Sequence, residues 1–339
     1  MKLGTSLRFV FPTGDHTLAI YQHLVATLPP GAFVERPMGP PSLAAQVSQL
    51  VDLADAARRA GLWALIVGEN HNVPAMYANC FQPVPTIARL SAHTGGLTIG
   101  AVFLAPFHHP LMLAEQIATV AAFVDAPTLW VFVVGDRPAA FDAVAIPLSE
   151  RTARTDALVP AVRALLAGES VTAVGPGWAL TDATVSPLPR HPVQLLIGGA
   201  VDAAVDRAAR IGDGWLTAQN ATDDELMRKL DRYADACARR GRRPLPVLRR
   251  DVHVAATDET ALAHVAPILA EGYRGLDFDR LVVGSPATVL ERLDAYRSMG
   301  FDRVLVRHIT GDRPELLESF ALLGAEVLPE ITRWQEPSW

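Results

Sequence analysis

A pair of glycines, Gly198 and Gly199, follows a short apolar run at residues 193–197 and precedes a segment whose apolar residues have helical spacing. The apolar run is too short for a helix and is typical of a parallel strand that is covered on both faces. Glycines let the backbone turn sharply at the end of such a strand. The turn would leave backbone N–H groups pointing outward at the positive end of the helix dipole, where a phosphate can bind. The pair therefore predicts either a phosphate site or simply a tight strand-to-helix turn.

A second group of polar residues, Glu69, Asn70 and His71, comes directly after another short apolar run, at residues 63–67. In a barrel of parallel strands, this is the end of the strand at which chemistry takes place. Asn70 cannot take up a proton at a useful pH, whereas a histidine can. Adjacent side chains that leave a strand point in different directions, so His71 has two open interpretations. It either contacts the site or packs in a structural role under a neighbouring loop.

The sequence predicts no metal site. Its ten histidines include the adjacent His108 and His109, but they show neither an HExxH motif nor another metal-ligand spacing. Glu69 and Asp136 do not form a convincing pair of metal ligands. We expect His109, which precedes a proline, to cap or anchor the start of a helix.

Composition excludes several classes of protein. The chain has 339 residues, a net charge of −6 and an isoelectric point near 5.9, which argues against nucleic acid or a membrane surface as partner. Its most apolar long window, residues 111–134, contains acidic residues and a proline, so no spanning helix is expected. No signal-peptide pattern opens the sequence. Cys80 and Cys237 lie far apart without a CxxC spacing, which favours a reduced, cytoplasmic setting.

Strand and helix patterns alternate about eight times along the chain, which predicts a parallel sheet wrapped by helices. The expected strands lie at residues 2–11, 63–67, 97–104, 128–134, 193–197, 215–216, 247–255 and 303–308. This count favours a closed TIM (β/α)₈ barrel, formed by residues 1–339 as a single domain, over an open sheet. No GxGxxG or GxxxxGK[ST] motif supports a dinucleotide-binding or P-loop domain.

Two segments interrupt the alternation. Residues 12–41 form a long stretch after strand one that is rich in proline and glycine, which we interpret as a lid or as a disordered insertion. Residues 170–185, with Gly175, Pro176 and Gly177 in the middle, predict an inserted hairpin. Ser42 is expected to cap one helix, and Ser285 with Pro286 to begin another.

Four segments together resemble the bacterial luciferase-like family of flavin-dependent oxidoreductases. They are GLWALIVGENH at 61–71, LTIGAVFLAPFHHPLMLAEQIATV at 97–120, VQLLIGGAVDAAVDRAARIGDGWL at 193–216 and VGSPATVLERLDAYRSMGFDRVLV at 283–306. The resemblance covers most of the chain outside residues 12–41. It implies a TIM barrel that binds reduced FMN, or in some branches a deazaflavin coenzyme, at the carboxyl ends of the strands. It also implies a homodimer, which the family forms through the helices expected at 86–92 and 110–123.

The family's phosphate site falls on Gly198, Gly199 and Ala200, and Ala200 stands where many relatives have a serine. Backbone N–H groups can still bind a phosphate there, and Arg137 lies in the loop where the family often has a phosphate-binding arginine. That loop is shorter than usual, and the family's Gly-Arg before the preceding strand is replaced by Ala126, Pro127 and Thr128. A solvated surface role for Arg137 remains the alternative.

The family motif after strand two is an acid followed by one or two histidines. Here Glu69 supplies the acid, Asn70 replaces the first histidine, and His71 matches the second. The resemblance also implies a non-proline cis peptide at about Val102–Phe103, which would bulge against the flavin ring.

These features support three hypotheses. The favoured one is a monooxygenase that uses reduced FMN, supplied by a separate reductase, and dioxygen to oxygenate a small organic substrate in a dry pocket. The first alternative is hydride transfer with the deazaflavin coenzyme. The second is a non-catalytic barrel that binds flavin weakly or serves a protein partner.

Overall fold

The computed structural model describes residues 1–14, 16–27 and 36–334. The strands of its main sheet are β1 (Lys2–Leu7), β3 (Ala64–Val67), β5 (Thr98–Leu104), β6 (Thr128–Val133), β9 (Val193–Gly198), β10 (Gly214–Leu216), β11 (Pro246–Val254), β12 (Leu281–Gly284) and β13 (Arg303–His308). Their order is β10-β9-β6-β5-β3-β1-β13-β11-β12, and β10 also pairs with β11. This extra pairing closes a parallel barrel of eight strands, with β12 beside β11 as a ninth. The predicted TIM barrel is confirmed.

Contacts divide the chain into two compact units. Unit 1 comprises Met1–Leu65, Val73–Phe81 and Leu248–Trp339, and unit 2 comprises Ile66–Asn72 and Gln82–Val247. The boundaries fall inside β3 and β11, so each of these strands contributes residues to both units. That the chain forms a single domain stays a prediction.

Unit 2 contains the parallel strands β5, β6, β9 and β10. Its helices are α3 (Pro83–Thr94), α4 (Pro110–Ala122), α5 (Pro138–Asp142), α6 (Arg151–Leu166), α7 (Asp202–Ile211) and α8 (Asp223–Ala238). Residues 128–132 of β6 are all buried, as expected for a strand that is covered on both faces. The predicted apolar face of α7 is also buried, since Val205, Ala208 and Ala209 are each 0% exposed.

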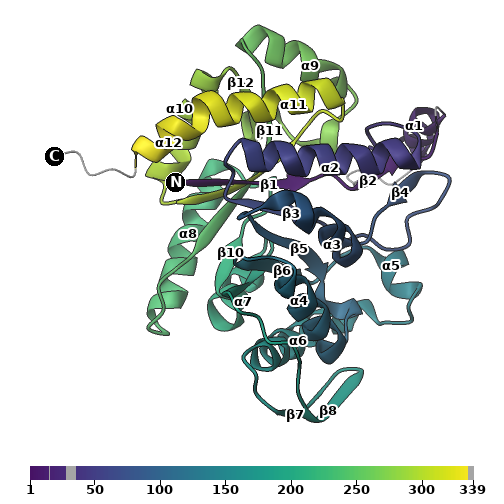
Figure 1. Cartoon of the computed structure of the whole chain (residues 1–339), viewed down its shortest axis with the longest axis vertical. Coiled ribbons are helices and arrows are strands. Elements are labelled where there is room, and N and C mark those ends of the chain that lie inside the picture. The colour runs from purple at the N-terminus through teal and green to yellow at the C-terminus, as the bar shows by residue number, and fades with distance from the viewer. Residues whose placement is uncertain (15, 28–35, 335–339) are drawn as a thin grey trace. The chain divides into compact units, whose positions relative to one another are not determined.

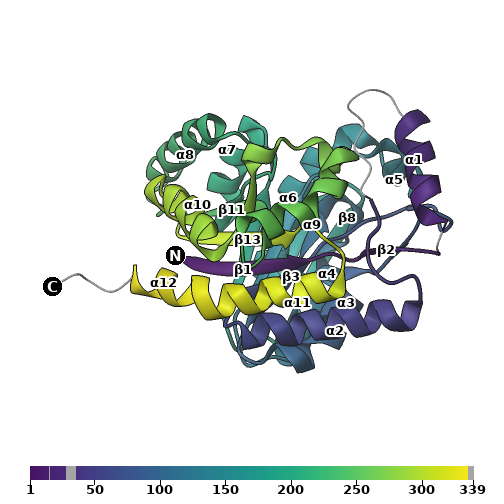
Figure 2. The same cartoon turned by 90° about the horizontal axis from the view of Figure 1, so that it is seen from above.

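Unit 1 pairs β1 with β13 in parallel, and its helices α2 (Leu43–Arg59) and α11 (Arg313–Leu322) lie side by side (Figures 1 and 2). Its other helices are α1 (Thr17–Thr27), α9 (Asp258–Ala270), α10 (Pro286–Ser298) and α12 (Leu328–Arg333). Both predicted N-caps are confirmed. Ser42 accepts a hydrogen bond from the backbone N–H of Ala45, and Ser285 accepts one from that of Thr288.

The predicted hairpin is present as β7 (Val171–Gly175) and β8 (Trp178–Ala183), which pair in antiparallel fashion. The interpretation of residues 12–41 as a disordered insertion is wrong where the structure describes them, while that of a lid stays a prediction. They contain α1, and Pro12 ends β2 (Val10–Pro12), which pairs with β4 (Ala78–Cys80). Proline and glycine at its ends obscured this helix in the sequence. Residues 28–35 of the expected lid lie outside the described residues.

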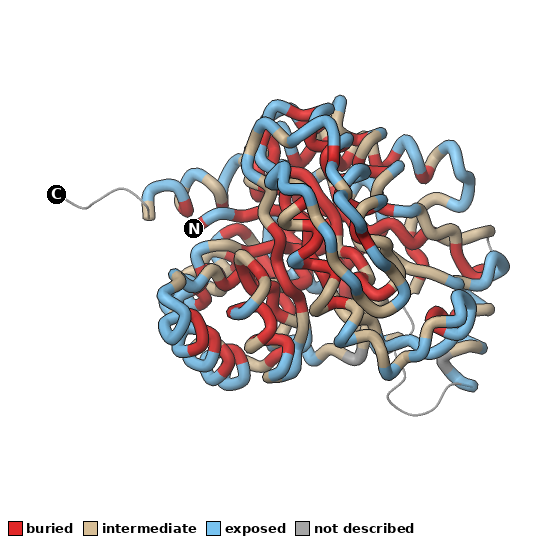
Figure 3. The backbone as a smooth tube through the Cα atoms, turned by 90° about the horizontal axis from the view of Figure 1, so that it is seen from below, coloured by how far each residue is buried: buried red, intermediate tan, exposed pale blue. Residues whose placement is uncertain are grey.

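Burial follows the elements: in Figure 3 the buried backbone concentrates along the strands and on one side of each long helix. None of the helices in the part of the chain that the structure describes has both the length and the apolar character needed to cross a membrane.

Candidate functional site

Glu69 lies just beyond β3 and is the centre of a group of three ionisable side chains in unit 2. Its side chain is 2% exposed. His108 donates from Nε2 to the two carboxylate oxygens at 3.0 and 3.1 Å, and His71 Nε2 lies 3.1 Å from Oε1. The backbone N–H of Leu104 donates to Oε2 at 2.5 Å. One buried carboxylate thus orients two imidazoles.

The surroundings of Glu69 decide its protonation state. Burial alone would raise the pKa of a carboxyl group, because it penalises the charged form. Here the contacts with His108 and His71, the charge of His108 and the Leu104 N–H outweigh burial and lower the pKa of Glu69 to about 2. Glu69 is therefore a carboxylate at neutral pH and acts as a fixed acceptor.

The two histidines keep one side toward solvent. The side chain of His71 is 30% exposed and that of His108 is 18% exposed. The ring of His71 lies edge-on to Phe107 at 5.1 Å between centroids, and that of His108 lies edge-on to Phe103 at 5.0 Å. Both imidazoles are thus held by an aromatic neighbour and a carboxylate while remaining accessible, which suits groups that hold or transfer a proton.

Sequence reasoning assigned His109 and not His108 a role, and it missed the contact between His108 and Glu69. The signal was available, since His108 follows the third strand as Glu69 follows the second. What the sequence hides is that a short 3-10 turn at Ala105–Phe107 brings His108 back to Glu69. His109 precedes α4 as expected, without a side-chain capping bond.

Asn70 and Arg137 meet next to this group. Arg137 Nη1 donates to Asn70 Oδ1 at 3.3 Å, and both residues lie at the surface of the loops that follow β3 and β6. Asn72 Nδ2 donates to the carbonyl of Ala139 at 2.8 Å, which links the loop after β3 to α5 as well. The structure therefore brings four of the predicted site residues together: Glu69, Asn70, His71 and Arg137.

The turn at Gly198 and Gly199 requires glycine for packing. A Cβ at Gly198 would lie 2.8 Å from Cγ1 of Val133, and one at Gly199 would lie 2.5 Å from the Cβ of Ala204. The expectation that the Gly199 N–H serves a phosphate is wrong, because it donates to the carbonyl of Leu216 at 3.2 Å. A tight strand-to-helix turn is thus a sufficient interpretation of these two residues.

The helix start that follows the turn still fits a phosphate group. Ala200 and Val201 are exposed. The N–H of Ala204 donates to the carbonyl of Val201 at 2.8 Å, so those of Asp202 and Ala203 are the ones at the start of the ten-residue α7 that have no partner within the helix. Asp202 brings negative charge to this first turn, but its carboxylate lies 3.3 Å from Arg228 and 3.4 Å from Arg232. These two arginines, four residues apart on α8, were also missed by sequence reasoning.

The expected cis peptide at Val102–Phe103 is wrong. Among the described residues the cis peptide is Ser186–Pro187, and β5 continues its regular pairing with β6 through Val102, Phe103 and Leu104. Because this pairing is regular, β5 has no bulge at Val102 or Phe103. The ring of Phe103 is fully buried, stacks on Trp130 at 5.4 Å and contacts the ring of His108, while Val102 is half-buried.

All these residues follow neighbouring strands. Glu69 to His71 follow β3, His108 follows β5, Arg137 follows β6 and Ala200 follows β9, in the order in which these strands lie in the sheet. The carboxyl ends of parallel strands lie at the same edge of a sheet. Glu69 with its two histidines and the exposed start of α7 therefore lie along one edge of unit 2.

Known proteins are similar to this chain in sequence and in fold. The profile of the luciferase-like monooxygenase family matches residues 31–281. An F420-dependent glucose-6-phosphate dehydrogenase of Microbacterium testaceum is 25% identical over 324 residues, which cover 84% of this chain and 94% of that protein. An uncharacterised protein of Mycobacterium tuberculosis is 29% identical over 127 residues, so the chain spans 43% of the length of that relative.

Solved structures are similar at the level of the fold. The monooxygenase RslO1 from Streptomyces bottropensis superposes with a TM-score of 0.78 at 23% identity, covering 97% of this chain and 99% of that one. The oxygenating constituent of 3,6-diketocamphane monooxygenase from Pseudomonas putida, solved with FMN, gives a TM-score of 0.67 at 17% identity, covering 88% and 99%. The family match, which extends over most of the chain, is decisive: the chain belongs to the luciferase-like monooxygenase family, whose members are flavin- or F420-dependent oxidoreductases.

Proposed function

We propose that the protein is a monooxygenase that uses reduced FMN and dioxygen to oxygenate a small organic substrate. The observation that carries this proposal is the edge of unit 2 at which the Glu69 group and the exposed start of α7 follow neighbouring strands. A flavin mononucleotide has a phosphate at one end and a reactive ring at the other. A phosphate position and a proton-holding position along one edge of the sheet would match these two ends.

In this proposal each residue has a distinct role. The N–H groups at the start of α7 bind the phosphate, and Arg137 adds charge-assisted hydrogen bonds from the loop after β6. Glu69 stays ionised and keeps His71 and His108 oriented. The two histidines hold or transfer a proton beside the flavin ring, and the aromatic residues around them exclude water. Reduced FMN, when bound, supplies the electrons with which dioxygen is activated.

A second candidate function is hydride transfer with a deazaflavin coenzyme. It is favoured by the relative from Microbacterium testaceum, which is named an F420-dependent glucose-6-phosphate dehydrogenase and aligns over 84% of this chain. The Glu69 group suits this reaction as well, because an imidazole held by a carboxylate can accept the proton that leaves an alcohol.

The proposal also includes a separate flavin reductase as partner and a homodimer as assembly. No GxGxxG motif for nicotinamide binding is present in the sequence, so a separate reductase would supply the reduced flavin. A cytoplasmic location and a homodimer complete the proposal.

Anaerobic titration decides between the two cofactors. We expect reduced FMN to bind more tightly than the reduced deazaflavin coenzyme, and its reoxidation in air-saturated buffer to follow a different rate when bound than when free. Tighter binding of the deazaflavin, with no effect on FMN reoxidation, would support the second candidate. Absence of binding by either cofactor would reject both.

A further inference from the structure

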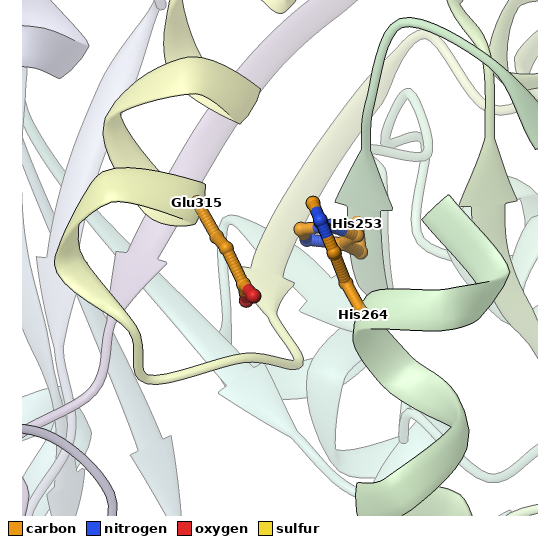
Figure 4. A group of neighbouring side chains, drawn as sticks. All are labelled: His253, His264 and Glu315. Atoms are coloured by element: carbon orange, nitrogen blue, oxygen red, sulfur yellow. Dashed lines mark hydrogen bonds between the residues drawn. The ribbon is translucent and has the colours of Figure 1, made fainter. Parts of the chain in front are cut away.

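A cluster of three possible metal ligands lies in unit 1 (Figure 4). His253 comes from β11, His264 from α9 and Glu315 from α11, so 62 residues separate the first from the last. Each side chain offers one ligand atom, and these atoms all lie within 4.8 Å of one another. Within the cluster, His253 Nε2 lies 2.9 Å from His264 Nδ1.

His253 is the buried member of the cluster. It is 0% exposed, and its Nδ1 atom is buried without a hydrogen-bond partner among the described residues. The nitrogen that faces the cluster is the other one, Nε2, which lies beside His264. Folding has therefore placed one buried imidazole nitrogen next to a second imidazole and near a carboxylate, an arrangement that a bound cation would make favourable.

Glu315 is oriented by its own neighbours. Thr310 donates from its hydroxyl to Oε2 of Glu315. Asp312, the N-cap of α11, accepts a hydrogen bond from the backbone N–H of Glu315 at 3.1 Å, which fixes the first turn of the helix. Metal-binding carboxylates are usually hydrogen-bonded in this way, because the second contact holds the free oxygen toward the ion.

The cluster borders open space. A cavity of about 670 Å³ in the same unit is lined in part by His264, Thr310 and Glu315. A cation can enter through this cavity, and one of its coordination positions can remain open toward it. Ligand atoms of one tetrahedral zinc ion lie about 3.3 Å apart. His264 and Glu315 are only half-buried, so rotation of their side chains can reach this spacing.

We propose that His253, His264 and Glu315 form a Zn²⁺ site that joins β11, α9 and α11 and leaves one coordination position facing the cavity. Two neutral imidazoles and one carboxylate are ligands that zinc prefers, whereas Mg²⁺ and Ca²⁺ prefer oxygen alone. Among first-row ions such a site also binds zinc more tightly than iron(II). The sequence concealed the site because its ligands come from three elements and form no motif.

The test uses the full chain after removal of metal by dialysis against a chelator. Zn²⁺ is titrated in competition with a chromophoric chelator, and we expect one equivalent to bind with a micromolar or lower dissociation constant. His264→Gln and Glu315→Gln should each weaken this binding at least tenfold. His23→Gln is the matched control, since His23 is exposed on α1 and outside the cluster, and it should leave the affinity unchanged.

Two further measurements distinguish lost zinc ligands from misfolding and from adventitious binding at surface histidines. Unfolding of each metal-free variant should match that of the wild type, which excludes loss of binding through misfolding. X-ray absorption of the zinc-loaded wild type should show two imidazole nitrogens in the coordination shell. No stoichiometric binding, binding that both cluster variants retain, or a shell without imidazole would each overturn the proposal.

Discussion

Glu69 is the central residue of the candidate site, and opposing effects act on its charge. Burial penalises its charge, yet His108 and one backbone N–H donate hydrogen bonds to its oxygens, and His71 Nε2 lies 3.1 Å from one of them. A hydrogen bond to a charged group contributes about 1.5 to 3 kcal/mol, so several of them outweigh the cost of burial. The carboxylate is thus both a stabilising element of unit 2 and the group that orients His71 and His108.

The pH dependence of the free energy of unfolding therefore tests this role of Glu69. Its pKa is lowered from 4.5 to about 2, so its contribution is fully present above about pH 4.5 and is lost as the pH falls through about 2. Glu69→Gln should therefore lower the free energy of unfolding at pH 7 by up to about 3 kcal/mol. Urea unfolding should show this difference from the wild type shrinking between about pH 4.5 and pH 2.

The matched control is Glu291→Gln, which removes an exposed carboxylate on α10 and should change stability little at any pH. If the two variants lose the same stability at pH 7, the buried group around Glu69 does not have the electrostatic role assigned to it.

Arg137 provides the second test at the residue scale. Its exposed guanidinium bonds to Asn70 and is free to add charge-assisted bonds to a phosphate at the same edge. Arg137→Ala should weaken FMN binding roughly ten- to a hundredfold, since each such bond contributes about 1.5 to 3 kcal/mol and every 1.4 kcal/mol is tenfold. Isothermal titration calorimetry measures this change.

Riboflavin lacks the phosphate, and its affinity should hardly change in Arg137→Ala. Arg190→Ala removes another exposed arginine of unit 2 and should leave FMN binding as in the wild type. Equal losses for FMN and riboflavin would mean that Arg137 does not bind the phosphate.

At the scale of elements, the sequence predicts a helix or strand boundary well when neighbouring residues determine it. The serine caps at Ser42 and Ser285 define where α2 and α10 begin, and β13 occupies the predicted residues 303–308. β12 was missed because four residues carry too little periodicity, and α1 because proline and glycine flank it. Local patterns predict single elements well and predict poorly those that depend on distant partners.

The helices α3 and α4 carry the proposed dimer interface. They pack on each other, and Met112 on α4 and Phe123 just after it are 62% and 59% exposed. Exposed apolar side chains on a helix can form part of an interface between copies of a chain. Met112→Glu should therefore shift the protein from dimer to monomer in light scattering at micromolar concentration.

Met227→Glu is the control for this substitution, because Met227 is 53% exposed on α8 and lies outside the proposed interface. It should leave the dimer intact. A wild-type protein that is already monomeric would remove the proposal.

At the scale of the whole molecule, the sequence predicted the barrel because eight strand–helix alternations, each weak by itself, point to the same architecture. It predicted the site only in part. Glu69, His71 and Arg137 follow strands and could be found by position, whereas the contact of His108 with Glu69 depends on the path of one turn. The occupied N–H of Gly199 depends on Leu216 of a neighbouring strand. Such contacts are properties of the folded chain and not of any sequence window.

Cofactor binding should also be visible in the stability of the whole chain. A ligand that binds only the folded state, at a hundred times its dissociation constant, adds about 2.7 kcal/mol to the free energy of unfolding. For a chain of 339 residues this corresponds to an increase in Tm of roughly 4 °C. Differential scanning calorimetry with FMN should show this increase, and riboflavin at the same concentration should produce a smaller one, because it cannot use the start of α7 or Arg137. If riboflavin raises the Tm as much as FMN does, the turn at Gly198 and Gly199 serves packing alone. The deazaflavin or non-catalytic interpretation would then be favoured over the FMN-dependent monooxygenase.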